Sequence, residues 1–543
     1  MAEAQTVATA VVDALKEMGV RYVFGVPSGG WVDYMEALRQ TEGIEFILTT
    51  HEGGAGMMAD VCGRLTGAPG ACFGTFGPGA TNLATGVGEA LLDRSPVIAL
   101  TDEMPAAMRG RTTQMGIDHQ ALFRPLTKKT TRLEPQSVKS ILFDAGRVAL
   151  EGRPGPVHVG LPVGMSAEKA SNENVSFHRP SGPEPADPTL LKQAAKLFAQ
   201  AKKPVLAVGL GAVHARAQDE IRALAEKHKV PVVLTPMAKG MLGEDHPCYA
   251  GVLFHALSNV VGETHQQADL IVGIGYDPVE FNYESWMPKT AKLISFDLEP
   301  VDIDRDSYEI AVDAVGDIGT SLNALLALSP VANEWDFGAL AQRRVAIFEK
   351  LKPSKTGFGP KGALAVLREV LPQDGIMTCD VGAHTHLIGQ LWRTPAPGAQ
   401  IMTNGWSTMG FGIPAAIAAK LVHPARLVCT VVGDGGFLMT AGEIATAIRC
   451  NLHIVIVVLT DNDLALIRIK QEKKANPIYG TPVRDRGAIG GNNIFGAHVR
   501  TAQNTAEFRD ALRWAFAADG PVIVEAIVDS REYDAVVLKN DKP

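Results

Sequence analysis

Short apolar runs alternate with amphipathic stretches along most of this chain. Near the C-terminus, Leu427–Val432 and Ile454–Leu459 are continuous apolar runs, typical of strands that are buried on both faces. The stretch between them has helical periodicity from roughly Thr440 to Cys450. This order of strand, helix and strand predicts a βαβ unit of a parallel sheet.

The same alternation appears in three segments of the chain. Two stretches separate them: 166–188, which is rich in Pro, Asn, Ser and Glu, and 328–360, which ends in Gly and Pro. We therefore expect an α/β protein with three doubly wound parallel-sheet domains, at 1–170, 188–330 and 355–543.

Acidic residues follow both strands of the C-terminal βαβ unit. Gly433-Asp434-Gly435 comes after the first strand, and Asp461-Asn462-Asp463 comes after the second. Open α/β sheets bind ligands at the carboxyl ends of their strands. Carboxylate oxygens suit Mg²⁺, and the glycines at 433, 435 and 436 let the backbone approach a phosphate closely. The pattern predicts a magnesium site that holds a diphosphate.

Another acidic residue, Glu52, follows the apolar run Phe46–Leu48 and precedes the small residues Gly53–Gly56. It is either an acid that the dipole of a helix N-terminus stabilises, or a functional carboxyl group. His51-Glu52 is not part of a zinc HExxH motif, because Ala55 stands where the second histidine is required.

With the glycine-rich turns at 24–30, 77–82, 380–384 and 407–414, these motifs resemble the thiamine diphosphate (ThDP) signature. The chain is similar to the superfamily of acetolactate synthase, pyruvate oxidase and the 2-oxo acid decarboxylases, and most similar to catabolic, FAD-free acetolactate synthases. The resemblance implies that Asp434 and Asp461 give side-chain oxygens to Mg²⁺ and that Asp463 gives its backbone carbonyl. The family usually has Asn at the position of Asp461. The three domains would be pyrimidine-binding, central Rossmann-like and diphosphate-binding.

The resemblance also assigns roles at the cofactor. Glu52 would hydrogen-bond to the aminopyrimidine ring and favour the imine that removes the C2 proton. Met409 would force the cofactor into a V shape, although a methionine is also an adaptable core residue. The carbonyl of Ser407 would accept from the 4′-amino group. Further cofactor contacts are expected at Pro27, Gly77, Asn82, Gly382, His384, Gly433, Gly435, Gly436 and Asp463.

Candidate substrate residues depart from the family pattern. Met115 stands where acetolactate synthases have a glutamine, and it cannot donate a hydrogen bond, although Gln114 is one position away. Ser28 stands where the family prefers glycine. His119 and His384 are candidate proton donors. Lys470 either attracts an anionic substrate or is a solvated helix charge.

The expected reaction follows from the cofactor. The enzyme would cleave a small, pyruvate-like 2-oxo acid and transfer the resulting enamine to a second carbonyl, as acetolactate synthase does. The alternatives are a simple 2-oxo acid decarboxylase, an acyl transfer like that of sulfoacetaldehyde acetyltransferase, and a silent regulatory subunit. The intact Glu52, Asp434 and Asp461 argue against the silent subunit.

The central segment contains a strand and a GxG turn at Val205–Gly211, but the next strand does not end in the acid of a dinucleotide fingerprint. Biosynthetic acetolactate synthases carry an Asp-Arg pair after the later strand, whereas this chain has Asp277-Pro278. We therefore expect no FAD.

Composition limits the remaining possibilities. The net charge of −8 argues against a nucleic-acid partner, and no apolar run has membrane-spanning length. The six cysteines form no CxxC pair, and residues 1–10 lack the features of a signal peptide, so a cytoplasmic enzyme is expected. The resemblance places the active site at a subunit interface, in a homodimer or homotetramer.

Overall fold

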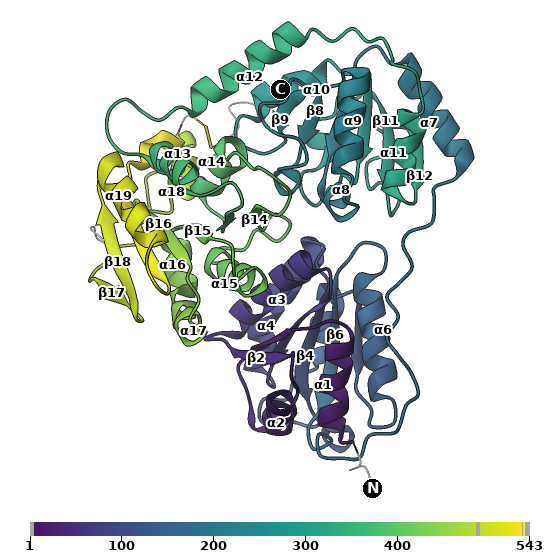
Figure 1. The fold of residues 1–543 in the computed structure, drawn as a ribbon, viewed down its shortest axis with the longest axis vertical. Helices are drawn as coiled ribbons and strands as arrows, with labels where there is room; N and C mark the ends of the chain where they lie inside the picture. Colours follow the sequence, from purple (N-terminus) through teal and green to yellow (C-terminus); the bar gives the residue numbers. More distant parts are fainter. Residues whose placement is uncertain (1–4, 485–488, 535, 538–543) are drawn as a thin grey trace.

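The computed structural model describes residues 5–484, 489–534 and 536–537. Three sheets, each dominated by parallel strands and covered by helices, form three lobes (Figure 1). This architecture confirms the expected α/β class with three doubly wound sheets. The prediction that residues 1–10 are not a signal peptide includes residues 1–4, which lie outside the described residues.

The N-terminal sheet has the order β2-β1-β3-β4-β6-β5, and its pairs are parallel. Its strands are β1 (Tyr22–Gly25), β2 (Glu45–Leu48), β3 (Gly70–Gly74), β4 (Val97–Glu103), β5 (Lys129–Arg132) and β6 (Pro156–Pro162). Its helices are α1 (Val7–Glu17), α2 (Val32–Gln40), α3 (Glu52–Thr66), α4 (Pro78–Leu92), α5 (His119–Phe123) and α6 (Val138–Leu150).

The central sheet has the order β12-β11-β10-β7-β8-β9. Its strands are β7 (Pro204–Val208), β8 (Val232–Leu234), β9 (Tyr249–Val252), β10 (Leu270–Ile274), β11 (Lys292–Asp297) and β12 (Glu309–Val315). Its helices are α7 (Pro188–Gln200), α8 (Leu210–His214), α9 (Gln218–His228), α10 (Ser258–Gln266) and α11 (Ile318–Leu326).

The C-terminal sheet has the order β14-β13-β15-β16-β19-β18-β17, and β17 pairs antiparallel with β18. Its strands are β13 (Ile376–Cys379), β14 (Gln400–Met402), β15 (Val428–Gly433), β16 (Val455–Thr460), β17 (Asn493–Ile494), β18 (Ala497–Ala502) and β19 (Val522–Ile527). Its helices are α13 (Pro360–Val370), α14 (Ala383–Leu391), α15 (Gly412–Val422), α16 (Asp434–Thr440), α17 (Ile444–Arg449), α18 (Ala465–Lys473) and α19 (Thr505–Phe516).

The prediction of one helix from roughly Thr440 to Cys450 is wrong about where the helical region begins. Helix α16 already begins at Asp434, and a 3₁₀ turn at Ala441–Glu443 separates it from α17. Gly435 and Gly436 lie inside α16, where small residues allow close packing. A Cβ on Gly436 would lie 1.7 Å from the Asp380 carboxylate.

The break expected at 328–360 contains a helix of its own, α12 (Phe337–Leu351). Asp336 caps this helix by accepting from the backbone of Gly338 and Ala339. Leu340 and Ile347 are buried on its inner face. The stretch that separates the central and C-terminal lobes in sequence is therefore partly helical.

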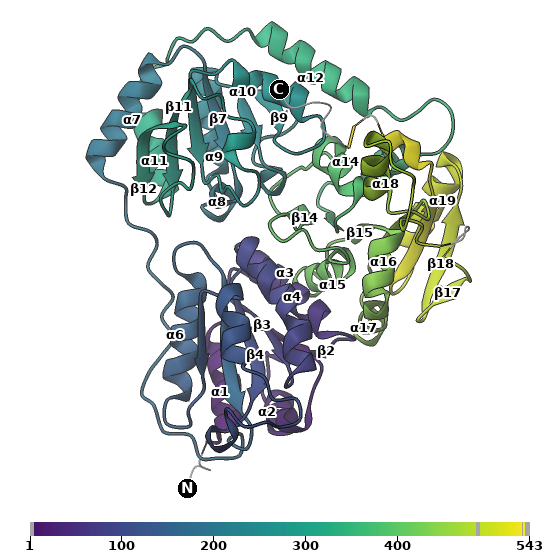
Figure 2. The same cartoon turned by 180° about the vertical axis from the view of Figure 1, so that it is seen from behind.

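The N-terminal and C-terminal lobes pack directly against each other. Helix α15 lies against α3 (Figure 1), and one hydrophobic cluster includes Phe24 and Met58 from one lobe and Phe411 and Ile413 from the other. A long segment without helix or strand connects β6 to α7 along the outside of the molecule (Figure 2). Glu52 and the wedge candidate Met409 thus belong to lobes that share a core.

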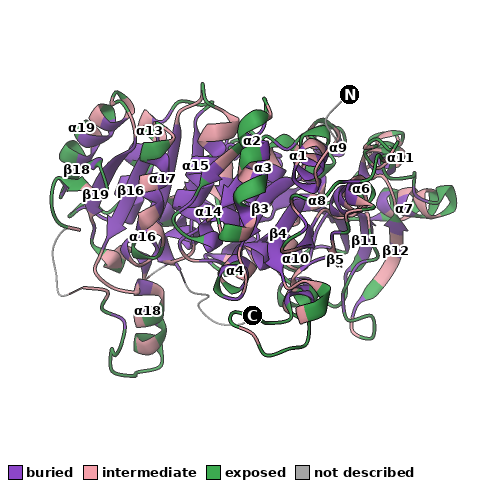
Figure 3. Cartoon of the chain, turned by 90° about the horizontal axis from the view of Figure 1, so that it is seen from below, coloured by how far each residue is buried: buried purple, intermediate pink, exposed green. Residues whose placement is uncertain are grey.

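The inner strands of the sheets are mostly buried, whereas α2 and α18 carry exposed residues (Figure 3). None of the helices in the described part of the chain is both long and apolar enough to cross a membrane. All six cysteines are free thiols, and five of them are buried.

Candidate active site

The carboxyl ends of β15 and β16 open into a pocket of about 120 Å³. Asp434 begins α16 directly after β15, and Asp461 follows β16, so the parallel pairing of the two strands places both carboxylates at one sheet edge. The pocket is lined, among others, by Gly382, His384, Met409, Gly433, Asp434, Gly435, Gly436, Asp461, Asp463 and Tyr533. Nine cofactor and metal candidates from the sequence therefore line one cavity.

The two carboxylates of this pocket repel each other. Burial, followed by the charge of Asp434, raises the pKa of Asp461 to about 7. Burial also raises the pKa of Asp434, although the backbone of Asn462 (2.6 Å) and of Gly435 (2.8 Å) donates to it. A divalent cation would remove this repulsion, so the residues fit Mg²⁺.

The side chain of Asp463 has a positively charged partner of its own. Its carboxylate lies 3.4 Å from the Arg468 guanidinium. Its backbone N–H donates to Asp461 at 3.1 Å, which holds the turn that follows β16. This arrangement fits the expected use of its backbone carbonyl.

Asp380 packs against Gly436 and holds the neighbouring part of the pocket in place. One of its oxygens lies 2.8 Å from Nε2 of His384, and the other accepts from the backbone of Gly410 at 2.8 Å. It is fully buried, directly after β13. Asp380 therefore fixes both the His384 ring and the turn next to Met409.

The turn that carries Met409 has an unusual backbone. Ser407 has φ +56° and Gly410 has φ +84°, so the chain is left-handed on both sides of the methionine. The hydroxyl of Ser407 donates to the carbonyl of Asn404 at 2.8 Å. Met409 is half-buried and lines the pocket, as a residue that contacts the cofactor must.

Glu52 lies in the N-terminal lobe at the first position of α3, where His51 caps the helix through Gly53. The amide of Asn82 on α4 donates to Glu52 at 3.0 Å. The carboxyl group is buried between α3 and α4, and a Cβ on Gly79 would lie 3.2 Å from it. The structure therefore holds the side chain of Glu52 in one place.

Gly77, before α4, has φ +49° and contacts two other candidates. Its N–H donates to Nε2 of His119 at 3.3 Å, and a Cβ there would lie 3.0 Å from the carbonyl of Met115. Thr101 lies 3.0 Å from Nδ1 of His119, so both ring nitrogens are engaged. Burial lowers the pKa of His119 to about 4. The ring of His119 is therefore held between Gly77 and Thr101.

The remaining candidates of this lobe lie nearer its surface. Gln114, Met115 and Pro27 are exposed, and Met115 has φ +58°. The hydroxyl of Ser28 donates to Asp102 at 2.5 Å. This bond directs Ser28 into the lobe.

One chain does not bring its two sets of candidates together. Glu52, Asn82 and Gly77 are not among the residues that line the pocket of Asp434 and Asp461. Each lobe therefore carries half of the expected site.

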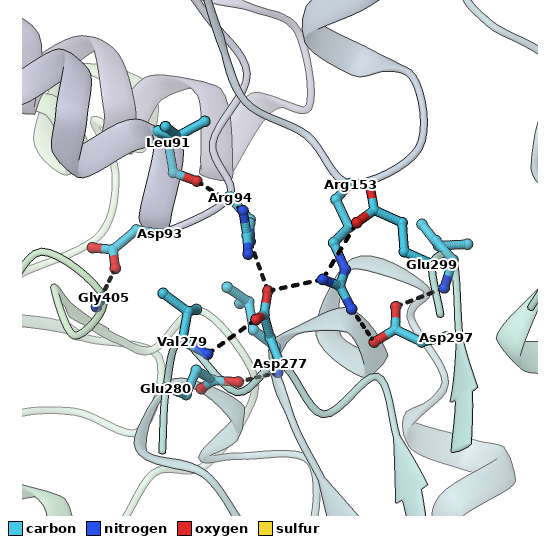
Figure 4. Close-up of polar contacts among 12 residues, drawn as sticks. Leu91, Asp93, Arg94, Arg153, Asp277, Val279, Glu280, Asp297, Glu299 and Gly405 are labelled. Carbon is cyan, nitrogen blue, oxygen red and sulfur yellow. Dashed lines mark hydrogen bonds and ion pairs between the residues drawn. The ribbon is translucent and has the colours of Figure 1, made fainter. Parts of the chain in front are cut away.

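The N-terminal lobe also contacts the central lobe through arginines (Figure 4). Arg94 donates to Asp277 at 2.6 Å, and Arg153 donates to Asp297 at 2.9 Å. Burial opposes the charge of Asp277, but Arg94 and Arg153 lower its pKa below the usual value. The loop that follows β10 is therefore fixed to the N-terminal lobe.

Two site residues were missed at the sequence level. Asp380 appeared only as the start of a turn, although it stands four positions before His384, a spacing that brings two residues together on a helix. Asp102 is buried at the carboxyl end of β4 and accepts from Ser28 and from Thr75. The sequence carried no signal for Asp102 beyond its position at the end of an apolar run.

Three family models match the three lobes. They describe a thiamine pyrophosphate enzyme: its N-terminal TPP binding domain at residues 5–122, its central domain at 191–325 and its C-terminal TPP binding domain at 380–526. Thiamine pyrophosphate is ThDP. The chain belongs to the thiamine pyrophosphate enzyme family and is a ThDP-dependent enzyme.

Relatives match over nearly the whole chain. An acetolactate synthase of Bacillus subtilis is 32% identical over 98% of this chain and 94% of its own length. The large subunit of acetolactate synthase isozyme 1 of Escherichia coli is 30% identical, with 96% and 94% covered. A catabolic acetolactate synthase of Raoultella terrigena is 30% identical, with 96% and 95% covered.

Proposed function

We propose that this enzyme condenses two molecules of pyruvate into acetolactate and CO₂, with ThDP and Mg²⁺. The single observation that carries the proposal is the pocket in which Asp434 and Asp461 face a cradle of glycines. The curated relatives are named acetolactate synthases, and this supports pyruvate as the substrate. No contact in the described residues favours simple decarboxylation or acyl transfer to phosphate.

ThDP supplies a carbon nucleophile and accepts the electrons that remain when CO₂ leaves the substrate. The residues of the chain bind and orient it. Asp434 and Asp461 hold Mg²⁺ with the carbonyl of Asp463, and the backbone at Gly433, Gly435 and Gly436 receives the diphosphate. Gly382 and His384 contact the cofactor beside these glycines, where Asp380 holds the histidine.

The residues near the reacting end have different tasks. Met409 and the carbonyl of Ser407 orient the cofactor, with Pro27, Gly77 and Asn82 on its aminopyrimidine side. Glu52 shares a proton with the aminopyrimidine ring, and Asn82 keeps its carboxyl group in place. Ser28, Gln114 and Met115 contact the substrate.

We propose a homodimer, or a homotetramer built from two such dimers, in which Glu52 of one chain completes the pocket of its partner. Two observations support this: the half-sites do not share a cavity, and Leu438, Met439 and Trp406 expose apolar surface near the pocket. We further propose that the enzyme is cytoplasmic, which the free thiols support. We also propose domains at 1–170, 188–330 and 355–543, which the three sheets support.

Mixing two inactive variants tests the shared site. Glu52→Gln and Asp434→Ala each remove one half-site, so a mixed dimer has one intact site. Random exchange of subunits is expected to restore roughly a quarter of wild-type activity. Activity is measured after the variants are co-refolded, and each variant refolded alone is the control. No recovery in a sample that contains mixed dimers would contradict a site shared between chains.

Cofactor binding is expected to raise the melting temperature. A ligand that binds only the folded state stabilises it by about 2.7 kcal/mol at 100 times its Kd. ThDP with Mg²⁺ should therefore shift the midpoint upward, whereas ThDP with EDTA should not. The measurement is differential scanning calorimetry. The same midpoint with and without the complete pair would contradict the proposed holoenzyme.

We also propose that the central domain works without FAD. The turn at Gly209 that could receive a phosphate already has a partner, because the N–H of Leu210 donates to the carboxyl group of Glu280 at 2.8 Å. The backbone of Gly275 and Tyr276 lies so close that a Cβ on Gly209 would be 2.5 Å from it. This packing supports a structural role for the GxG turn.

A further inference from the structure

A chain of hydrogen-bonded polar side chains runs through the interior of the N-terminal lobe. It starts at His119 on α5 and ends at Glu103, the last residue of β4. Its members, in order, are His119, Thr101, His158, Thr130, Gln120 and Glu103. All of them are buried except Thr130, which is half-buried. Buried polar groups have lost their hydrogen bonds to water, so the direction of each bond in this chain matters for stability.

The chain has a definite direction when it is followed from Gly77. A backbone N–H can only donate, so Nε2 of His119, 3.3 Å away, accepts from Gly77. His119 is uncharged at neutral pH, because burial lowers its pKa to about 4. Its proton is therefore on Nδ1, which donates to the hydroxyl oxygen of Thr101 at 3.0 Å. Thr101 then donates its own proton to Nε2 of His158 at 2.8 Å.

The same direction results when the chain is followed from its other end. Glu103 forms an ion pair with Arg132 at 2.5 Å, so both of its oxygens accept. The amide nitrogen of Gln120 donates to Glu103 at 2.5 Å, and the amide oxygen accepts from Thr130 at 2.7 Å. Thr130 therefore accepts from Nδ1 of His158, 2.7 Å away. This leaves Nε2 of His158 as an acceptor, in agreement with the result from the first end.

Both histidines are thus fixed in one tautomer, with the proton on Nδ1. Phe123 stacks on the ring of His158, with 4.3 Å between the ring centroids. Burial lowers the pKa of His158 well below its ordinary value, so this ring is uncharged as well. Hydrogen bonds that all point one way polarise and strengthen each other. The chain is therefore a firm support for the ring of His119.

This support holds the turn at Gly77, which precedes α4. Gly77 has φ +49°, a backbone conformation that favours glycine, and a Cβ there would lie 3.0 Å from the carbonyl of Met115. Helix α4 begins at the next residue, and its Asn82 donates to Glu52 at 3.0 Å. A shift of this turn would therefore move the Met115 segment and the partner of Glu52 together.

We propose that His119 is a positioning residue for this active site. It holds the N–H of Gly77 and keeps the turn before α4 against the Met115 segment. The chain that ends at Glu103 keeps its ring in the tautomer that can accept. The inference rests on the proposed function, which places Gly77 at the cofactor and Met115 at the substrate. His119 acts through the turn and takes part in no bond-making step.

Two substitutions at His119 separate positioning from proton donation. His119→Gln places an oxygen near the position of Nε2 and can still accept from Gly77, but it is not an acid. His119→Phe keeps a ring and leaves the N–H without an acceptor. In His119→Phe, kcat/KM for pyruvate is expected to fall about tenfold, the effect of one buried donor without a partner, mainly through a higher KM. In His119→Gln it is expected to stay within about threefold of wild type.

His228→Phe is the matched control. His228 is buried in the central lobe, and its Nδ1 likewise accepts from a backbone N–H, that of Val331 at 3.2 Å. This substitution should lower the melting temperature as His119→Phe does, but leave kcat/KM unchanged. Equal losses of activity in His119→Gln and His119→Phe would overturn the inference, because both variants lack a proton donor. Wild-type kcat/KM in His119→Phe would overturn it as well.

The tautomers are measured without any activity assay. Magic-angle spinning NMR of the wild-type holoenzyme with ¹⁵N-labelled histidine reports which ring nitrogen carries the proton, and His119→Gln and His158→Phe assign the two signals. Both rings are expected to be uncharged, with the proton on Nδ1. A proton on Nε2 of His119 would overturn the inference and leave the proposed function standing. No CO₂ from pyruvate in the wild type, with the expected tautomers, would overturn the proposed function and the role of His119 with it.

Discussion

Replacing Glu52 by glutamine is expected to slow the exchange of the C2 proton of bound ThDP by about 10²- to 10⁴-fold, the range of general acid–base catalysis. Glutamine keeps the size of the side chain, and Asn82 can still donate to its oxygen. It cannot share a proton with the aminopyrimidine ring. The cofactor should therefore still bind, while deprotonation and carboligation are lost together.

The measurement is hydrogen–deuterium exchange at C2, followed by NMR after acid quench. Glu45→Gln is a matched control, because Glu45 is exposed on β2, the strand that precedes α3. Equal exchange rates in Glu52→Gln and the wild type would refute the role of Glu52. Loss of ThDP binding in Glu52→Gln would show that its contribution is to binding instead.

Replacing Asp434 by alanine is expected to weaken Mg²⁺-dependent ThDP binding by more than about 100-fold, since loss of residues behind a metal ligand already costs about 10- to 100-fold. The substitution also frees the N–H groups of Gly435 and Asn462, which Asp434 accepts from. Asp434→Asn keeps an oxygen for these bonds but removes the charge.

Isothermal titration calorimetry with ThDP, at fixed Mg²⁺, measures the effect. Asp374→Ala is the control, because Asp374 is exposed in the turn before β13. Both variants at Asp434 should lose affinity if charge on the metal dominates. Wild-type affinity in Asp434→Ala would place the metal elsewhere.

Sequence pattern predicted the three-sheet fold because buried parallel strands leave continuous apolar runs, such as Ile454–Leu459. It failed where packing overrides local preference. The helix was predicted to begin at roughly Thr440, yet Gly435 and Gly436 already lie inside α16, where Gly436 has to be small because Asp380 packs against it. A single sequence does not contain that contact.

The candidate site, too, could be predicted only in part. The turns after strands could be placed on one sheet edge, and the pocket contains Asp434, Asp461 and Met409 together. The environment of His119 could not be predicted, because its partners Gly77 and Thr101 come from different elements. Likewise, only the fold shows that Lys470 lines a cavity beside the cofactor pocket.

The central claim is that this enzyme joins two molecules of a 2-oxo acid. The most direct test gives the purified protein ThDP, Mg²⁺ and pyruvate, without FAD, and identifies the products by NMR. The account predicts acetolactate and CO₂, with product formation that requires both ThDP and Mg²⁺. Acetaldehyde as the sole product, or no CO₂ from pyruvate although ThDP is bound, would contradict it.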